Sequence, residues 1–230
     1  MSRLEPATLG SELLDDPGAD PAKVCRSLRN IARANRWFGG AAAVRYGLRQ
    51  AFEDLPPGAA LTLLDVGAGA GDLTHMATVW AAGRGVRLVP FGLERHPAAA
   101  RLARDGGLPT VLGDGGVLPL RDRSVDLVLL SQVAHHFAPN AIVRLFRECG
   151  RVARRAVIVA DLRRSPLAAL GFALGSRLLG FDDDTVRDGA LSLRRGFSAA
   201  SLRALLESAG ARAAVARRTG ARLVAVWRTA

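Results

Sequence analysis

A glycine-rich turn directly after an apolar run of this 230-residue chain has the residue types needed to hold a cofactor. Residues 61–66 are mostly apolar and include Asp65, and Gly67, Gly69 and Gly71 then occupy alternate positions. Because glycine lacks a Cβ, such a turn tolerates positive φ and lets a ligand lie against bare backbone. A helix starting after Gly71 would point free N–H groups at that ligand. Asp72 stands where a dinucleotide fingerprint needs its third glycine, which argues against an NAD-dependent oxidoreductase.

Three further apolar runs end in polar or glycine residues that suit a nucleoside-containing cofactor. The run 86–93 ends in Glu94, whose carboxylate can accept hydrogen bonds from both hydroxyls of a ribose. The run 110–113 is followed by Asp114 and Gly115, and the run 124–131 ends in Ser131. In an alternating strand–helix fold these ends meet at the carboxyl edge of one sheet. The sequence therefore predicts one crevice shared by the glycine turn and these residues.

Two adjacent histidines, His135 and His136, follow the fourth run at the edge of this crevice. Histidine titrates near neutrality, so it is a natural general base for an acceptor that must lose a proton. A structural role, such as capping the strand or binding a backbone carbonyl, is the alternative. His75 and His96 are less suited to catalysis, because they fall on the first helix and just after Glu94.

Alternating strands and helices are expected to position these residues. Pro56-Pro57-Gly58 separates this core from two leading helices, the first over about 21–37 and the second after Gly39-Gly40. We expect strands at 61–67, 86–93, 109–113, 125–131 and 155–161, helices at 71–82, 97–105, 139–150 and 198–210, and two closing strands within 213–216 and 223–227. This alternation predicts a mostly parallel sheet with right-handed crossovers and helices on both faces.

Over roughly residues 55–230 the chain resembles the class I S-adenosylmethionine-dependent methyltransferases, particularly the small-molecule branch that includes quinone-pathway and natural-product enzymes. The resemblance implies a Rossmann-like, seven-stranded sheet with an antiparallel C-terminal strand. It also implies S-adenosylmethionine (SAM) as cofactor and S-adenosylhomocysteine as product. The cofactor-binding residues that it implies are Asp65, Gly67, Ala68, Gly69, Gly71, Glu94, Arg95, Gly113, Asp114, Gly115, Ser131 and Gln132.

Within that set, the resemblance assigns the methionine part of the cofactor to residues 65–71, the ribose to Glu94 and the adenine amino group to Asp114. Leu130-Ser131-Gln132-Val133 resembles the segment that closes over the methyl-donor end. Of the two candidate bases, His136 better matches the recurrent histidine of the family. The implied reaction is methyl transfer to a small apolar or aromatic acceptor, phenolic, quinone-like or lipid-like, in secondary metabolism.

The acceptor pocket is expected to come from two regions outside the cofactor turn. We predict an N-terminal helical lid over residues 1–55, which offers Asn35, Arg36 and Trp37, and a methyltransferase domain over 56–230. An insertion at about 162–197 offers Phe172 and further apolar residues, namely Leu167, Leu170, Leu174, Leu178, Leu179 and Phe181. A packed helical cover and an ordinary amphipathic helix are the respective alternatives. Asp182, Asp183 and Asp184 are predicted to form a solvated cap or turn, and no metal site is predicted.

The net charge of +11 suggests nucleic acid or an anionic membrane surface, but the arginines are scattered along the chain. A nucleic-acid methyltransferase is one alternative, although enzymes that modify base amines share an Asn/Asp-Pro-Pro-aromatic segment where this chain reads Ser131-Gln132-Val133-Ala134. A non-catalytic scaffold that keeps the cofactor fold is another. Segment 167–181 is too short to span a membrane but suits peripheral contact. The oligomeric state is left open.

The remaining signals concern the cell compartment. Cys25 and Cys149 lack paired spacing, so we expect buried thiols rather than a disulfide or a metal site. Residues 1–6 include the acidic Glu5 and carry no apolar core of signal-peptide length, which predicts a cytoplasmic protein.

Overall fold

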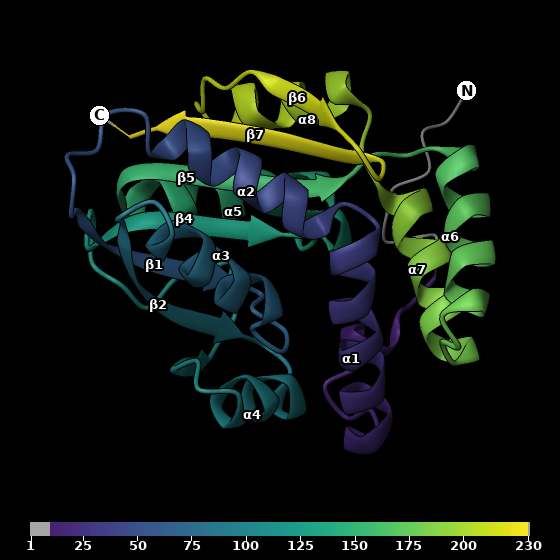
Figure 1. Cartoon of the computed structure of the whole chain (residues 1–230). Coiled ribbons are helices and arrows are strands. Elements are labelled where there is room, and N and C mark those ends of the chain that lie inside the picture. Colours follow the sequence, from purple (N-terminus) through teal and green to yellow (C-terminus); the bar gives the residue numbers. More distant parts are fainter. Residues whose placement is uncertain (1–9, 230) are drawn as a thin grey trace.

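A seven-stranded sheet forms the centre of the computed structural model, which describes residues 10–229 (Figure 1). The strand order is β3-β2-β1-β4-β5-β7-β6, and β7 runs antiparallel to both of its neighbours while the other pairs are parallel. The strands are β1 (Ala60–Val66), β2 (Arg87–Glu94), β3 (Thr110–Leu112), β4 (Val125–Ser131), β5 (Ala153–Leu162), β6 (Val215–Arg218) and β7 (Arg222–Arg228). The predicted Rossmann-like sheet with an antiparallel C-terminal strand is confirmed.

Helices cover both faces of this sheet (Figure 1). They are α1 (Pro21–Trp37), α2 (Gly40–Ala51), α3 (Asp72–Ala82), α4 (Pro97–Asp105), α5 (Pro139–Val152), α6 (Pro166–Leu178), α7 (Asp183–Arg195) and α8 (Ala199–Ser208). Two short 3₁₀ helices, η2 (Leu13–Asp15) and η3 (Ala134–His136), lie in connecting segments. The pattern-based boundaries agree with these to within two residues for most elements, because strong start and stop signals flank them, such as the Ser198 cap of α8.

Two apolar clusters, one on each face, hold the layers together. Helices α2 and α3 pack on one face with Leu63, Leu127 and Ile158, whereas α5 and α8 pack on the other with Val128 and Val157. Alternate residues of β4 and β5 therefore point into opposite clusters, and the residues on both faces of these strands are apolar. This is the pattern of a parallel sheet that is buried on both faces.

The leading helices take part in this core as well as in the crevice. Helix α1 has the predicted bounds, and Asp20 caps its N-terminus by accepting a hydrogen bond from the Ala22 N–H. Helix α2 buries Val44 and Leu48 against the sheet. The division between a lid and a methyltransferase domain at residues 55/56 stays a prediction. The prediction from Met1–Pro6 concerns residues outside the described range.

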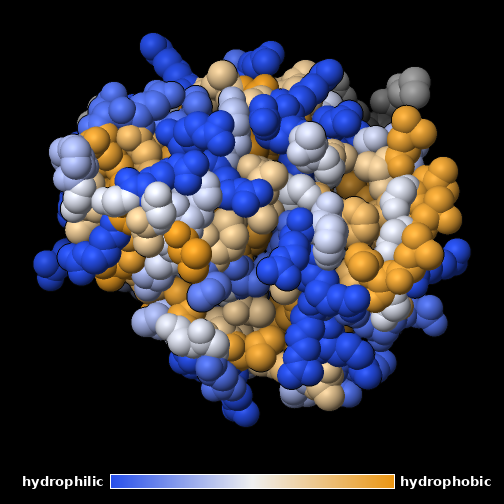
Figure 2. All heavy atoms as spheres, viewed as in Figure 1, coloured by the Kyte–Doolittle hydropathy of each residue, from blue (hydrophilic) through white to orange (hydrophobic). Residues whose placement is uncertain are grey.

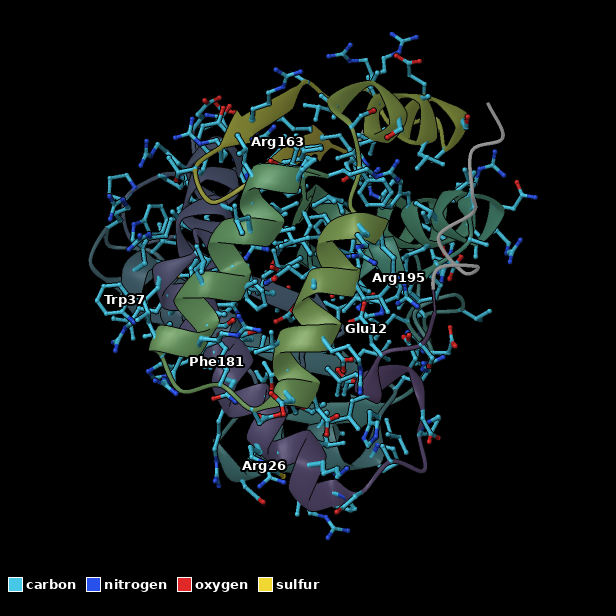
Figure 3. The ribbon with its side chains drawn as sticks, turned by 90° about the vertical axis from the view of Figure 1, so that its right-hand side faces the viewer. Glu12, Arg26, Trp37, Arg163, Phe181 and Arg195 are labelled. Carbon is cyan, nitrogen blue, oxygen red and sulfur yellow. The ribbon has the colours of Figure 1, made fainter. Side chains whose placement is uncertain are left out.

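The predicted insertion forms two helices, α6 and α7, that lie side by side (Figure 3). Asp182 caps α7 by accepting a hydrogen bond from the Thr185 N–H, as the acidic run predicted. Phe172 lies on the inner side of α6 and contacts the ring of Phe38 edge-on, with ring centroids 5.5 Å apart. In the described part of the chain, no helix has both the length and the apolarity for a membrane crossing.

The prediction that the leucines of α6 line the pocket is wrong for most of them. Leu170, Leu174 and Leu178 are exposed, and Leu167 reaches the rim of the cavity with most of its surface in solvent. Helical periodicity explains the difference, because these leucines share one face and Phe172 points from the opposite one. The cysteines are free; Cys149 is buried as predicted, whereas Cys25 is half-buried.

Candidate active site

A cavity of about 550 Å³ opens at the carboxyl ends of the strands, between α1, the glycine turn, η3 and the pair α6–α7. Its volume falls in the range of small-molecule sites. Eleven residues predicted from the sequence lie on its wall or rim: Asn35, Asp65, Gly67, Ala68, Gly69, Ser131, Gln132, His135, His136, Leu167 and Phe172. Residues that are far apart in the chain therefore meet here, because the parallel strands end at one edge of the sheet.

The glycine turn has the backbone geometry that its sequence predicts. Gly67, Gly69 and Gly71 have φ values of 74°, 56° and 78°, a region that favours glycine. A Cβ at Gly67 would lie 2.4 Å from a methyl group of Val133, so this position also needs glycine for space. The Gly69 N–H donates a hydrogen bond of 2.8 Å to Glu94 Oε2. A hydrogen bond therefore connects the turn directly to Glu94, the residue predicted to bind the ribose.

The other predicted cofactor residues lie outside the cavity wall but near the same edge. Glu94 also accepts a hydrogen bond from the His96 N–H, and the Gly113 N–H donates to the Glu94 carbonyl. The Asp114 carboxylate accepts a hydrogen bond from the Gly116 N–H. Gly71 follows the end of β1, and Gly115 follows the end of β3. Arg95 instead donates to the carbonyl of Asp15, which belongs to the segment that precedes α1.

The predicted pocket roles of Arg36 and Trp37 are wrong, because both side chains are exposed and neither lines the cavity. Trp37 is 69% exposed and projects away from Glu12 and Arg195 (Figure 3). In the last turn of α1, Ala34 and Asn35 face inward, since both are buried and both line the cavity. A helix places consecutive residues about 100° apart, so a run of three cannot share one wall.

Two acids with raised pKa values, the buried Asp65 and the half-buried Asp72, stand at the cofactor end of the cavity. Burial raises the pKa of Asp65 to about 7, and the nearby Asp72 and Glu94 carboxylates act in the same direction, against a hydrogen bond that the Thr74 hydroxyl donates to Asp65. Burial also raises the pKa of Asp72, although Asn35 donates a hydrogen bond of 2.9 Å to it. Both carboxyls are therefore in surroundings where a ligand cation would be favourable.

The two histidines stand at the other end, each beside its own carboxylate. His135 Nδ1 lies 2.7 Å from Asp161 Oδ1, and both side chains are buried. Asp161 also accepts hydrogen bonds from the Ala134 and Leu162 N–H groups. Although burial raises the pKa of Asp161, the His135 ring and the Leu162 N–H outweigh it and hold the pKa below its usual range. His135 Nε2 finds no hydrogen-bond partner among residues 10–229.

His136 belongs to an ion-paired cluster that joins the segment before α1 to α7. Its Nδ1 lies 2.9 Å from Asp15 Oδ1, and its Nε2 lies 3.8 Å from Glu12 Oε2. The buried Arg195 guanidinium lies 3.1 Å from Glu12 Oε1 and 3.0 Å from Asp15 Oδ2 (Figure 3). Burial raises the pKa of Glu12, whereas His136 and Arg195 hold the pKa of Asp15 below its usual range against its partial burial.

Glu12, His135 and His136 also bring potential metal-ligand atoms within 4.8 Å of one another. The prediction of no metal site did not foresee this grouping, because Glu12 is far from the histidines in the sequence. Arg195 already supplies a positive charge in contact with Glu12. We therefore describe the grouping as part of the ion-paired cluster.

Comparison with known proteins agrees with this geometry. Residues 64–160 match the model of the methyltransferase domain family. The matched methyltransferase-domain segment contains the glycine turn, Glu94 and both histidines, and it ends one residue before Asp161. The search of curated proteins found no match.

Many solved structures share the fold of the whole chain. A SAM-dependent methyltransferase from Aquifex aeolicus is 17% identical, with a TM-score of 0.61 over 92% of this chain and 99% of that one. The complex between the Trm112 methyltransferase activator of Haloferax volcanii and a methyltransferase gives 17% identity and a TM-score of 0.59 over 91% and 96%. Magnesium protoporphyrin IX methyltransferase from Synechocystis PCC 6803 with bound SAM gives 14% and 0.59 over both full chains. At these identities the similarity concerns the fold.

Outside the methyltransferase-domain segment, sequence reasoning missed Glu12, Asp15, Asp161 and Arg195. One signal for Asp161 was present, since it ends an apolar strand as Glu94 does. Glu12 and Asp15 lie in a short segment with no periodicity, and Arg195 belongs to a pair of arginines at a helix end. Only the tertiary structure brings these charges together.

Proposed function

We propose that this protein is a SAM-dependent methyltransferase that acts on a small apolar or aromatic acceptor. The observation that carries this proposal is the continuity of one cavity, which joins the glycine turn beside Glu94 to the histidine pair 135–136. A cofactor that lies along the turn would present its reactive end toward the histidines. The methyltransferase-domain match over residues 64–160 supports the same reading.

The residues of the turn fit this cofactor. The three glycines leave a cradle that a Cβ at Gly67 would disturb. The buried Asp65 carboxyl and the half-buried Asp72 carboxyl suit a cationic ligand, and the Ser131 hydroxyl is buried without a hydrogen-bond partner among the described residues. When bound, SAM would supply a methyl group attached to a positively charged sulfur, and this sulfur would be the leaving group when the acceptor atom displaces it in line. The protein mainly has to hold the acceptor atom close to that methyl group and aligned with it.

Proton removal from the acceptor is assigned to His135, with Asp161 as its partner. Donation of the Nδ1 proton to Asp161 leaves a lone pair on Nε2, which no other described group uses. The carboxylate then stabilises the imidazolium that forms when the proton is taken. The match of His136 to the family had favoured that residue, but His136 is held between Asp15, Glu12 and Arg195. We therefore propose that His136 helps to hold the ion-paired cluster of Glu12, Asp15 and Arg195 in place.

The acceptor end of the cavity is mainly apolar. Phe38, Phe172, Leu162 and Leu193 lie on its wall, and the Phe38–Phe172 contact fixes one side of it. Such a wall favours flat or alkyl groups, because burying apolar surface is worth about 25 cal/mol per Å². This lining supports a phenolic, quinone-like or lipid-like acceptor.

The cofactor assignment is tested by calorimetric titration with SAM and with S-adenosylhomocysteine. Loss of the acceptor oxygens in Glu94→Ala should weaken binding by about 1 to 3 kcal/mol, which is roughly 5- to 150-fold. Glu94→Gln keeps one acceptor oxygen and should lose less, and Glu53→Ala on the exposed surface is the matched control. A folded wild-type protein that binds neither compound would favour the non-catalytic scaffold.

The base assignment is tested by comparing His135→Gln with His136→Gln under single-turnover conditions. We expect His135→Gln to lower the rate of methyl transfer by about 10²- to 10⁴-fold at unchanged SAM affinity. His136→Gln should have a smaller effect on that rate. The reverse ranking would transfer the role of base to His136.

A further inference from the structure

The outer face of α6 is a row of uncovered leucines. Leu167, Leu170, Leu174 and Leu178 are 81%, 59%, 55% and 88% exposed. Their spacing of three, four and four residues places them on one side of the helix, which we call the leucine face. Apolar side chains accordingly gather at the right-hand edge of the molecule in Figure 2, where α6 lies in Figure 1. No group within residues 10–229 buries this face.

The leucine face is not needed to build the cavity. The opposite side of α6 lines the cavity, since Ala168, Gly171 and Phe172 lie on the cavity wall and Phe172 packs against Phe38. Only Leu167, at the start of the helix, belongs to both the face and the cavity rim. A molecule on the leucine face would therefore lie about one helix diameter, ~10 Å, from the acceptor end of the cavity.

Positive charge surrounds the leucine face. Residues 163–181 contain three arginines and neither aspartate nor glutamate. Beyond the end of α6, Arg33 donates a hydrogen bond of 2.6 Å to the Leu179 carbonyl, and the neighbouring Arg36 is exposed. Trp37, 69% exposed, lies beside the lower part of α6 (Figure 3). An apolar helix face with arginines and a tryptophan at its border is typical of helices that lie in a membrane interface.

The acidic groups nearest to this face along the chain are largely occupied. Asp182 caps α7 and accepts a hydrogen bond from Asn30. Asp184 lies 3.5 Å from Lys23 Nζ and 3.2 Å from Arg187 Nη1. Asp183 is exposed, but the three arginines of residues 163–181 outnumber it, so the border of the leucine face keeps a net positive charge.

We propose that the leucine face docks on the surface of a bilayer that contains anionic lipids. The arginines complement the lipid phosphates, and the leucines enter the boundary between headgroups and acyl chains. A second copy of the chain fits less well, because a symmetric contact through α6 would bring two arginine borders together. Docking would place the rim of the cavity at the membrane, so that a lipid-soluble acceptor can enter without crossing water.

The test is flotation of the full-length protein with vesicles. One set contains roughly a quarter phosphatidylglycerol in phosphatidylcholine, and the other contains phosphatidylcholine alone. We expect binding to the anionic set that weakens as salt rises from about 0.05 M to about 0.5 M, and little binding to the neutral set. The double variant Leu170→Glu/Leu174→Glu should lower the partition coefficient at least about tenfold. Val79→Glu is the matched control, since Val79 is 61% exposed on α3.

Circular dichroism establishes that each variant is folded, and sedimentation velocity reports its oligomeric state. The proposal fails if the wild type does not bind anionic vesicles at low salt, or if the double variant binds as the wild type does. It also fails if the wild type is a dimer that the double variant dissociates while neither protein binds vesicles, because the leucine face would then be a contact between copies. Vesicle binding needs no turnover, so these outcomes are independent of the proposed methyl transfer.

Discussion

Asp65 gives the sharpest quantitative prediction, because the protein keeps this carboxyl buried with a strongly raised pKa. The pKa is about 7 in the folded protein against an ordinary value of 3.8, and burial is the main cause. A carboxyl of this kind binds its proton more tightly in the folded state than in the unfolded one. Its contribution to stability is therefore fully present below about pH 3.8 and is lost as the pH rises through about 7.

The size of the effect follows from the two pKa values. Each pH unit between them corresponds to about 1.4 kcal/mol, so ionised Asp65 costs the ligand-free protein on the order of 4 kcal/mol above pH 7. Asp65→Asn removes the ionisation and keeps an oxygen that can accept the Thr74 hydrogen bond. We expect the variant to match the wild type near pH 4 and to exceed its free energy of unfolding by on the order of 4 kcal/mol at pH 8.

Urea unfolding at several pH values between 4 and 8 measures this difference. The exposed Asp105→Asn is the control, and its difference from the wild type should stay within about 0.5 kcal/mol at every pH. A difference in unfolding free energy for Asp65→Asn that does not grow with pH would refute the reasoning.

The same variant also tests ligand binding, separately from stability. A ligand cation near Asp65 should lower the pKa of its carboxyl, so SAM binding to the wild type below pH 7 should release a proton. Calorimetry in buffers of different ionisation enthalpy detects this release. SAM binding to Asp65→Asn should release no such proton.

Two further predictions concern the turn and the ion-paired cluster. Gly67→Ala should destabilise the protein by about 1 to 3 kcal/mol and weaken SAM binding, because φ is 74° and the new Cβ would lie 2.4 Å from Val133. Thermal unfolding with and without SAM checks this prediction. An unchanged melting temperature would contradict it. Arg195→Gln should release the segment before α1, since it leaves Glu12 and Asp15 without their cation. Hydrogen exchange at residues 10–20 should then rise in the variant, and unchanged protection there would show that other contacts hold this segment.

The fold could be predicted from the sequence because each of its parts has a local signal. The glycine turn, the strand that ends in Glu94 and the caps at Ser198 and Asp182 are short-range patterns, and the alternation of elements fixes a parallel sheet. The cofactor end of the site follows from the same signals, because parallel strands bring their ends to one edge.

The acceptor end could not be predicted in the same way. Arg195 meets Glu12 and Asp15 across more than half of the chain, and no periodicity links them. The sequence also left open which face of α6 would point inward. The inner face carries one large ring, Phe172, while the leucines outnumber it on the outer side, so hydrophobicity alone selected the wrong face.

The charges at the two ends of the cavity are arranged as the proposed reaction requires. At the cofactor end, Asp65 is buried, Asp72 is half-buried, and neither contacts a cation in the described structure; their raised pKa values mean that a bound cation would be favoured there. At the acceptor end, Asp161 keeps a lowered pKa beside His135, so it is ready to stabilise an imidazolium. Methyl transfer from a sulfonium to a protonated acceptor moves one positive charge from the first end to the second. A site built only to bind a cofactor would need the first pair of acids but has no use for the second, which is why the His135–Asp161 pair favours an enzyme over a scaffold.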